Sequence, residues 1–163
     1  MTSRPLITLV AVAAAAAFAA RAEMPAGQVC LTPDGQVEPT ATQGWQQALQ
    51  NSDPRAMQFL AGRWYNQTRN PGTGQISHLV FAYEADGGMT YANDVCGPDN
   101  ANCSHYEGYG MYAAQWQGQD SISIFTNISD MSRSSFCSLS ALRFLDQDRA
   151  AGPDGQVAWQ RMK

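Results

Sequence analysis

The stretch that decides the fold is Leu79-Val80-Phe81-Ala82-Tyr83-Glu84-Ala85-Asp86-Gly87-Gly88-Met89-Thr90-Tyr91-Ala92-Asn93. Large side chains occur at every second position on each side of Asp86-Gly87. They are Leu79, Phe81 and Tyr83 before it, and Met89, Tyr91 and Asn93 after it. A period of two is typical of a β-strand with one buried face. Because Asp86-Gly87 between the two halves favours a tight turn, the stretch predicts a β-hairpin.

The same pattern continues on both sides of the hairpin. A strand is predicted at Trp64–Thr68, and Asp146–Gly155 is expected to be a turn-rich connection. The other predicted strands are one on which Tyr106, Gly108, Gly110, Tyr112, Ala114 and Trp116 share a face, then Ile122–Thr126, Phe136–Phe144 and Val157–Arg161. Seven or eight short antiparallel strands define an all-β fold, either a sandwich or an up-and-down barrel.

Residues 23–59 form a lead-in to these strands. The part up to Thr42 is rich in Pro, Gly, Thr and acids and predicts an extended arm held by Cys30. Thr42–Gln50 predicts a short helix with Trp45, Ala48 and Leu49 on one face. A second helical turn is expected after Asp53, which caps it ahead of Pro54. We expect both pieces to lie against the sheet as a lid or plug.

Residues 1–22 have the pattern of a secretory signal peptide. Arg4 precedes an apolar run from Leu6 to Ala20, and Ala20-Arg21-Ala22 offers small residues at the cleavage site. The alternative is a retained membrane anchor, but the run is shorter than the roughly 20 residues a spanning helix needs. We therefore expect cleavage after Ala22, no membrane span in the mature chain, and a periplasmic or secreted location.

Export changes how the four cysteines are interpreted. In an oxidising compartment an even set predicts two disulfides, for which three connectivities exist. Cys96 and Cys103 flank a segment dense in turn formers, so we favour that pair. Cys30 would then pair with Cys137. Neither zinc-site spacing nor a C-x-x-C redox motif is present.

Composition and charge exclude some functions. The chain has 163 residues, of which 44% are hydrophobic and 15% charged, as expected for one folded domain. Its 14 acidic and 10 basic residues give a formal net charge of −4. A nucleic-acid partner is not expected, because binding phosphates requires clustered Lys and Arg.

The sequence offers little for catalysis. His78 and His105 are the only histidines, and no G-x-S-x-G nucleophile motif occurs. Asp146, Asp148 and Asp154 could hold calcium, but their spacing matches no recognised calcium loop. We expect no enzyme activity, no catalytic residues, no metal and no cofactor.

A short motif before the first strand narrows the choice of fold. Leu60-Ala61-Gly62-Arg63-Trp64 resembles the G-x-W motif of the lipocalin and calycin superfamily. The resemblance implies a β-barrel over residues 60–163, of the small exported bacterial type. It also implies that Gly62 and Trp64 close one end and that Arg161 packs across the Trp64 ring. The chain is shorter than full-length lipocalins and lacks their other motifs.

A weaker resemblance points to the same architecture. Gly62–Gln67 and Gly88–Tyr91 are similar to the opening strands of the avidin and streptavidin family, whose barrels also begin with G-x-W. The later tryptophans that capture biotin in that family have no matching pattern here, so this resemblance supports the barrel and not biotin binding.

Five aromatic residues are the candidate binding site. Tyrosines that face inward line a small pocket with apolar walls and hydroxyl tips, or they simply fill the barrel. Gly108 and Gly110 leave room for a ligand or for a ring from across the barrel. The expected function is non-enzymatic binding of a small, partly apolar molecule, or a structural role; the alternative is a protease inhibitor with a free N-terminal arm. The candidate residues are Tyr83, Tyr91, Tyr106, Tyr112 and Trp116.

Overall fold

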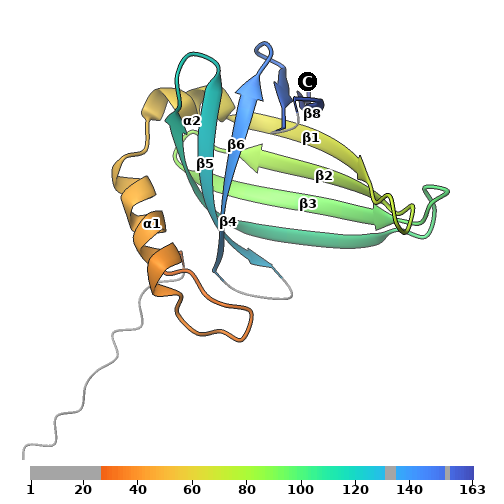
Figure 1. Cartoon of the computed structure of the whole chain (residues 1–163), viewed down its shortest axis with the longest axis horizontal. Coiled ribbons are helices and arrows are strands. Elements are labelled where there is room, and N and C mark those ends of the chain that lie inside the picture. Colours follow the sequence, from red (N-terminus) through yellow and green to blue (C-terminus); the bar gives the residue numbers. More distant parts are fainter. Residues whose placement is uncertain (1–26, 131–134, 153–154) are drawn as a thin grey trace, which may run out of the picture.

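A computed structural model describes residues 27–130, 135–152 and 155–163. In this part of the chain, eight antiparallel strands form a closed barrel, and two short helices precede it (Figure 1). The elements are α1 (Pro39–Gln50), α2 (Pro54–Leu60), β1 (Gly62–Arg69), β2 (Ile76–Tyr83), β3 (Gly88–Cys96), β4 (Ser104–Trp116), β5 (Ser121–Asp130), β6 (Phe136–Phe144), β7 (Arg149–Ala151) and β8 (Val157–Arg161). The all-β prediction with a short helical lead-in is confirmed.

The strands follow one another around the barrel in chain order. The predicted hairpin is β2–β3, in which Tyr83 pairs with Met89 across the Asp86-Gly87 turn. The barrel closes where β8 returns to β1 and Arg161 pairs with Trp64. Because this last pairing joins the two ends of a single sheet, the fold is an up-and-down barrel and not a sandwich.

The closure is incomplete along part of β6. On one side β6 pairs with β5 from Phe136 to Arg143, but on the other it meets β7 only through Arg143 and Phe144. β7 lies within the stretch 146–155, which was expected to be a turn-rich connection. Within that connection, Arg149–Ala151 forms a short strand that pairs with both β6 and β8, and it brings the barrel to the upper end of the expected seven or eight strands.

The helices cover one end and one side of the barrel. α1 begins at Pro39 and not at Thr42, because proline is favoured in the first turn of a helix, where its missing N–H is not needed. Asp53 caps α2 by accepting a 2.8 Å hydrogen bond from the Arg55 amide. Leu60 at the end of α2 is fully buried in the barrel core, so α2 plugs this end.

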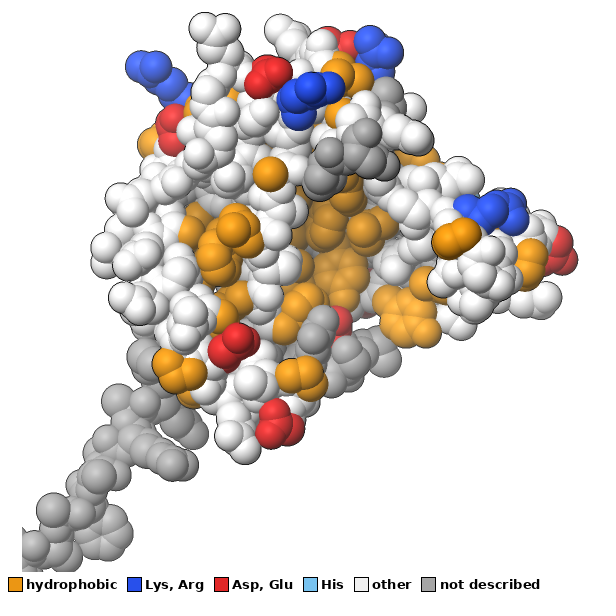
Figure 2. Space-filling view, in the orientation of Figure 1, with side chains coloured by type: hydrophobic (Ala, Val, Ile, Leu, Met, Phe, Trp, Pro, Cys, Tyr) orange, Lys and Arg blue, Asp and Glu red, His pale blue; other side chains and the backbone are white. Residues whose placement is uncertain are grey.

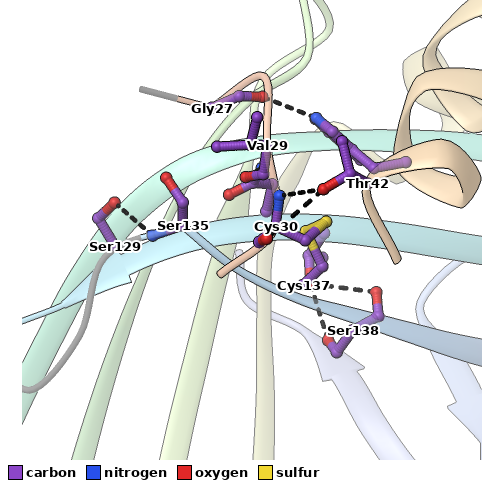
Figure 3. The surroundings of a disulfide bond; sticks show 11 residues. Gly27, Val29, Cys30, Thr42, Ser129, Ser135, Cys137 and Ser138 are labelled. Atoms are coloured by element: carbon purple, nitrogen blue, oxygen red, sulfur yellow. Dashed lines mark hydrogen bonds between the residues drawn. A yellow bond between two sulfur atoms is a disulfide. The ribbon is translucent and has the colours of Figure 1, made fainter. Parts of the chain in front are cut away.

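Both disulfides have the predicted pairing. Cys96–Cys103 closes the loop between β3 and β4, and Cys30–Cys137 ties the arm to β6 (Figure 3). Around the second disulfide, the Cys30 amide donates to Thr42 Oγ1 at 2.9 Å, and Asn127 Nδ2 donates to the Val29 carbonyl at 2.8 Å. Two disulfides fit a protein that folds in an oxidising, extracytoplasmic compartment.

The predicted signal peptide, residues 1–22, lies outside the described residues. Within the described ranges, neither helix is long and apolar enough to cross a membrane.

Candidate functional site

One end of the barrel is closed by the motif that suggested the fold. The guanidinium carbon of Arg161 lies 4.3 Å from the centroid of the Trp64 ring, and Trp64 itself is buried. Arg161 also donates to the carbonyls of Ala61 at 2.6 Å and Phe59 at 2.7 Å. Gly62 has a φ of 123°, and a Cβ there would lie 2.9 Å from the Arg161 Nη1. The positive φ of Gly62 favours glycine at this position, and a Cβ there would also displace the end of the Arg161 side chain.

Three of the five candidate aromatic residues belong to this closed end. The Tyr83 and Tyr112 rings lie 4.8 Å apart and both are buried, and Tyr112 donates to the Glu84 carbonyl at 2.7 Å. Burial raises the pKa of Tyr112 to about 12 and the pKa of Tyr83 further still. Trp116 packs edge-on against Phe59 with centroids 5.2 Å apart. Of the two alternatives expected for these rings, filling the barrel therefore describes Tyr83 and Tyr112, while Trp116 is half-buried.

Tyr91 occupies the space that Gly108 leaves. The two residues are paired across β3 and β4, and Gly108 is in turn paired with Asp130 on β5. The Tyr91 hydroxyl donates to Asp130 Oδ2 at 2.8 Å, and a Cβ on Gly108 would overlap the Tyr91 ring. At Gly110 a Cβ would overlap the backbone carbonyl of Asn127. The two glycines therefore admit a ring and a close backbone approach, and do not leave space for a ligand.

The other half of the lumen is open. Phe81, Tyr91 and Trp159 share the inner face and are half-buried, with Phe81 6.0 Å from Tyr91 and 5.2 Å from Trp159 between ring centroids. Figure 2 shows a hollow with a hydrophobic floor between β6 and the sheet of β1–β3. Tyr106 lies on the same face of β4 but is 50% exposed, so it is not part of a buried wall with Tyr83 and Tyr112.

Phe81 and Trp159 were not among the predicted site residues. Both could have been found by the alternation that selected the tyrosines, because Phe81 lies two residues before Tyr83 and Trp159 two residues before Arg161. We call the aromatic set Phe81, Tyr91 and Trp159 the open-lumen wall.

Polar side chains on the inner face near this wall are hydrogen-bonded to the protein. Asn66 Nδ2 donates to the Ala158 carbonyl, and Ser77 Oγ donates to Asn93 Oδ1 at 2.6 Å. The hydroxyls of Thr126 and Ser138 lie 2.8 Å apart. Because these groups already have partners, the open half of the lumen favours an apolar ligand over one that needs many hydrogen bonds.

The histidines lie on the outer face of the barrel. His78 is hydrogen-bonded to the Tyr65 hydroxyl at 2.8 Å and to Asn100 Oδ1 at 2.6 Å. His105 Nδ1 lies 2.6 Å from Asp94, and this hydrogen bond raises the pKa of the exposed His105 imidazole. Both side chains therefore face away from the lumen.

Two of the acids that were weighed as calcium ligands and not favoured are paired with arginines. Asp146 lies 2.7 Å from Arg149, a contact that lowers the pKa of Asp146, and Asp148 lies 3.5 Å from Arg161. Asp154 lies outside the described residues. The described residues contain no cluster of three His, Cys, Asp or Glu side chains placed to hold a metal ion.

Comparison with known proteins gives no relative. No protein-family model, no curated protein and no solved structure matches this chain.

Proposed function

We propose that the chain is an exported, lipocalin-like binding protein that holds a small, largely apolar molecule in the open half of its barrel. The observation that carries the proposal is the contrast between the two halves. At the closed end the Trp64, Tyr83 and Tyr112 rings are buried, whereas Phe81, Tyr91 and Trp159 on the inner face remain half-buried. Aromatic side chains that stay accessible on a concave wall are typical of ligand sites.

The lipocalin-like assignment is supported by the closed end. Gly62, Trp64 and Arg161 reproduce the closure that the G-x-W resemblance implies. With the predicted signal peptide and the two disulfides, this favours the periplasm or the extracellular medium as the place of action. We propose no catalytic role, since both histidines lie away from the lumen.

The protease-inhibitor alternative needs an arm that projects freely before Thr42. The disulfide from Cys30 to Cys137 and the 2.8 Å bond from the Leu31 amide to the Ser135 carbonyl hold this arm on the barrel. These contacts count against an inhibitory arm in residues 28–38, so binding in the lumen is the better-supported function.

The proposal is tested with N-phenyl-1-naphthylamine, an uncharged apolar fluorophore. We expect saturable binding with increased probe fluorescence, and at least about a tenfold rise in Kd for Trp159→Ala and for Phe81→Ala. Leu139→Ala is the matched control, because Leu139 is 67% exposed and lies outside the open-lumen wall. Circular dichroism checks that each variant is folded.

Saturable binding that is unaffected in both lumen variants would place the probe elsewhere and overturn the proposal. Absence of binding by the wild-type chain, with no small molecule retained in native mass spectrometry of protein from its own periplasm, would do the same.

A further inference from the structure

A groove of about 630 Å³ lies on the outer face of β1–β4, on the opposite side of the strands from the lumen. Its floor is made of small side chains that alternate with the inward-facing Phe81 and Tyr91 and therefore point outward. These floor residues are Val80, Ala82, Thr90 and Ala92. Small residues in the middle of a sheet face leave a depression between larger neighbours, and we call this depression the outer groove.

Three charged residues line the outer groove: Arg63, Glu107 and Asp130, whose carboxylate accepts a hydrogen bond from the Tyr91 hydroxyl. Arg63 and Glu107 stand at opposite corners of it. One cross-strand row runs from Arg63 through Ala82 and Thr90 to Tyr109. The next row runs through Val80 and Ala92 to Glu107. Arg63 is thus on β1 and Glu107 on β4, separated by three strand spacings, or roughly 14 Å, across the sheet and by one row, or roughly 7 Å, along it.

The shape of the outer groove does not fit a small molecule. Tyr109 is 69% exposed, and Arg63 and Glu107 are also exposed, so a bound molecule would keep much of its surface in water. Small-molecule sites enclose most of their ligand. A partner strand is excluded as well, because β2, β3 and β4 are hydrogen-bonded on both sides at these residues and offer no free edge. The occupant must therefore be a folded surface that makes contact through side chains.

We infer that the outer groove is an interface between two copies of this chain related by a twofold axis. In such an interface residue i contacts residue j of the other copy, and residue j contacts residue i. An axis lying in the interface, perpendicular to the line from Arg63 to Glu107 and through its midpoint, exchanges these two positions. It places Arg63 of each copy opposite Glu107 of the other, so that the two outer grooves face each other across the axis and the copies touch through the exposed side chains at the groove rims, such as Tyr109.

The charges of this face are available for those contacts. Arg63 makes no ion pair with any residue that the structure describes, and Glu107 has only the 3.7 Å contact with the exposed His105. The chain has a net charge of −4, which opposes the approach of two copies through most of their surface. The two ion pairs between Arg63 and Glu107 offset part of that repulsion at the interface and select a single orientation.

The apolar surface continues beyond the floor. Met111, which follows Tyr109 on the outer face of β4, is 41% exposed and lines a second depression together with Tyr109 and Gly27. This strip enlarges the face toward the area that specific interfaces bury, about 800 Å² per partner. The two ion pairs then lie at the edge of an apolar centre, which is the usual anatomy of an interface.

The test uses charge reversal and sedimentation velocity over a concentration series. Arg63→Glu places two acids opposite each other, and Glu107→Arg places two bases opposite each other. Each substitution alone is expected to weaken self-association by at least about tenfold. A mixture of the two variants restores both ion pairs within a heterodimer, so we expect it to associate as strongly as the wild-type chain. Arg143→Glu, at an exposed position on β6, is the control and should leave association unchanged.

A wild-type chain that stays monomeric up to about 200 μM would overturn the inference, since specific pairs with such interfaces associate well below that concentration. Variants that separate into monomers but do not recombine on mixing would also overturn it, because the twofold exchange of Arg63 and Glu107 requires recombination. Binding of N-phenyl-1-naphthylamine by each variant reports that its lumen and fold are intact.

Discussion

Removal of the Cys30–Cys137 disulfide by the double substitution Cys30→Ser and Cys137→Ser is expected to cause a large loss of stability. The bond closes a loop of 107 residues, whereas Cys96–Cys103 spans only 7. In the loop-entropy description, a bond across a loop of about 100 residues stabilises the folded chain by about 5 kcal/mol and one across a very short loop by roughly 2 kcal/mol. The long bond should therefore contribute roughly 2 to 3 kcal/mol more than the short one.

Packing around the long bond adds to this difference. Cys30 is fully buried in a small cluster with Trp45 and Ala113, and Cys137 packs against the same cluster. Loss of the bond loosens the arm over this cluster and exposes the Trp45 ring. By contrast, the short bond joins the buried Cys96 at the end of β3 to Cys103 in the following loop, and neither cysteine belongs to that cluster.

The assay is urea denaturation of the oxidised wild-type chain and of the two double-serine variants, followed by tryptophan fluorescence at fixed pH. The variant Cys96→Ser with Cys103→Ser is the matched control, since it also replaces two cysteines. An equal or larger loss of unfolding free energy in the control would refute the reasoning, because the size of the closed loop would then not determine the effect.

Three further predictions concern the barrel interior. Gly108→Ala is expected to cost about 1 to 3 kcal/mol in urea denaturation, because the added carbon overlaps the Tyr91 ring; an unchanged midpoint would contradict this packing. Arg161→Ala removes the cation from the Trp64 ring together with two charged hydrogen bonds and is expected to cost about 3 to 5 kcal/mol, with partial recovery in Arg161→Lys. Between pH 10 and 12 the unfolded chain releases the Tyr112 and Tyr83 protons while the folded chain, in which both pKa values are raised, retains them, so stability should fall by up to about 1.4 kcal/mol per pH unit for each tyrosine. Tyr112→Phe should lessen that slope, and an equal slope would contradict the assignment.

The strands were predictable because alternation is a local signal. The β2–β3 hairpin follows from period two around Asp86-Gly87, and both disulfide pairs follow from cysteine placement. Closure of the barrel is not local. It depends on the pairing of Trp64 with Arg161, which brings together strands from opposite ends of the domain. Only the G-x-W resemblance indicated this pairing in advance.

The candidate site was only partly predictable, because alternation gives the face of a residue and not its depth. Tyr83, Tyr91 and Tyr106 all occupy inner-face positions, yet the first is buried, the second half-buried and the third half-exposed. Depth depends on strand length and on what covers each end. Here the short β7 leaves one part of the lumen less covered, and α2 plugs one end of the barrel. The spacing of the tyrosines in the sequence indicates neither of these two features.

The two proposals concern opposite faces of the same strands, and the geometry of a strand makes them separable. On β2, Phe81 faces the lumen while Ala82 forms the outer floor, and on β3 Tyr91 and Ala92 divide in the same way. A substitution at Arg63 or Glu107 changes only the outer face, so it should affect association and leave probe binding unchanged. Both faces share β2 and β3. A ligand that shifts these two strands from the lumen side is therefore expected to change the affinity of two copies for each other, and association should change the affinity for the ligand by the same factor. Probe titrations above and below the association concentration measure that coupling directly, and equal affinities at both concentrations would mean that the two faces act independently.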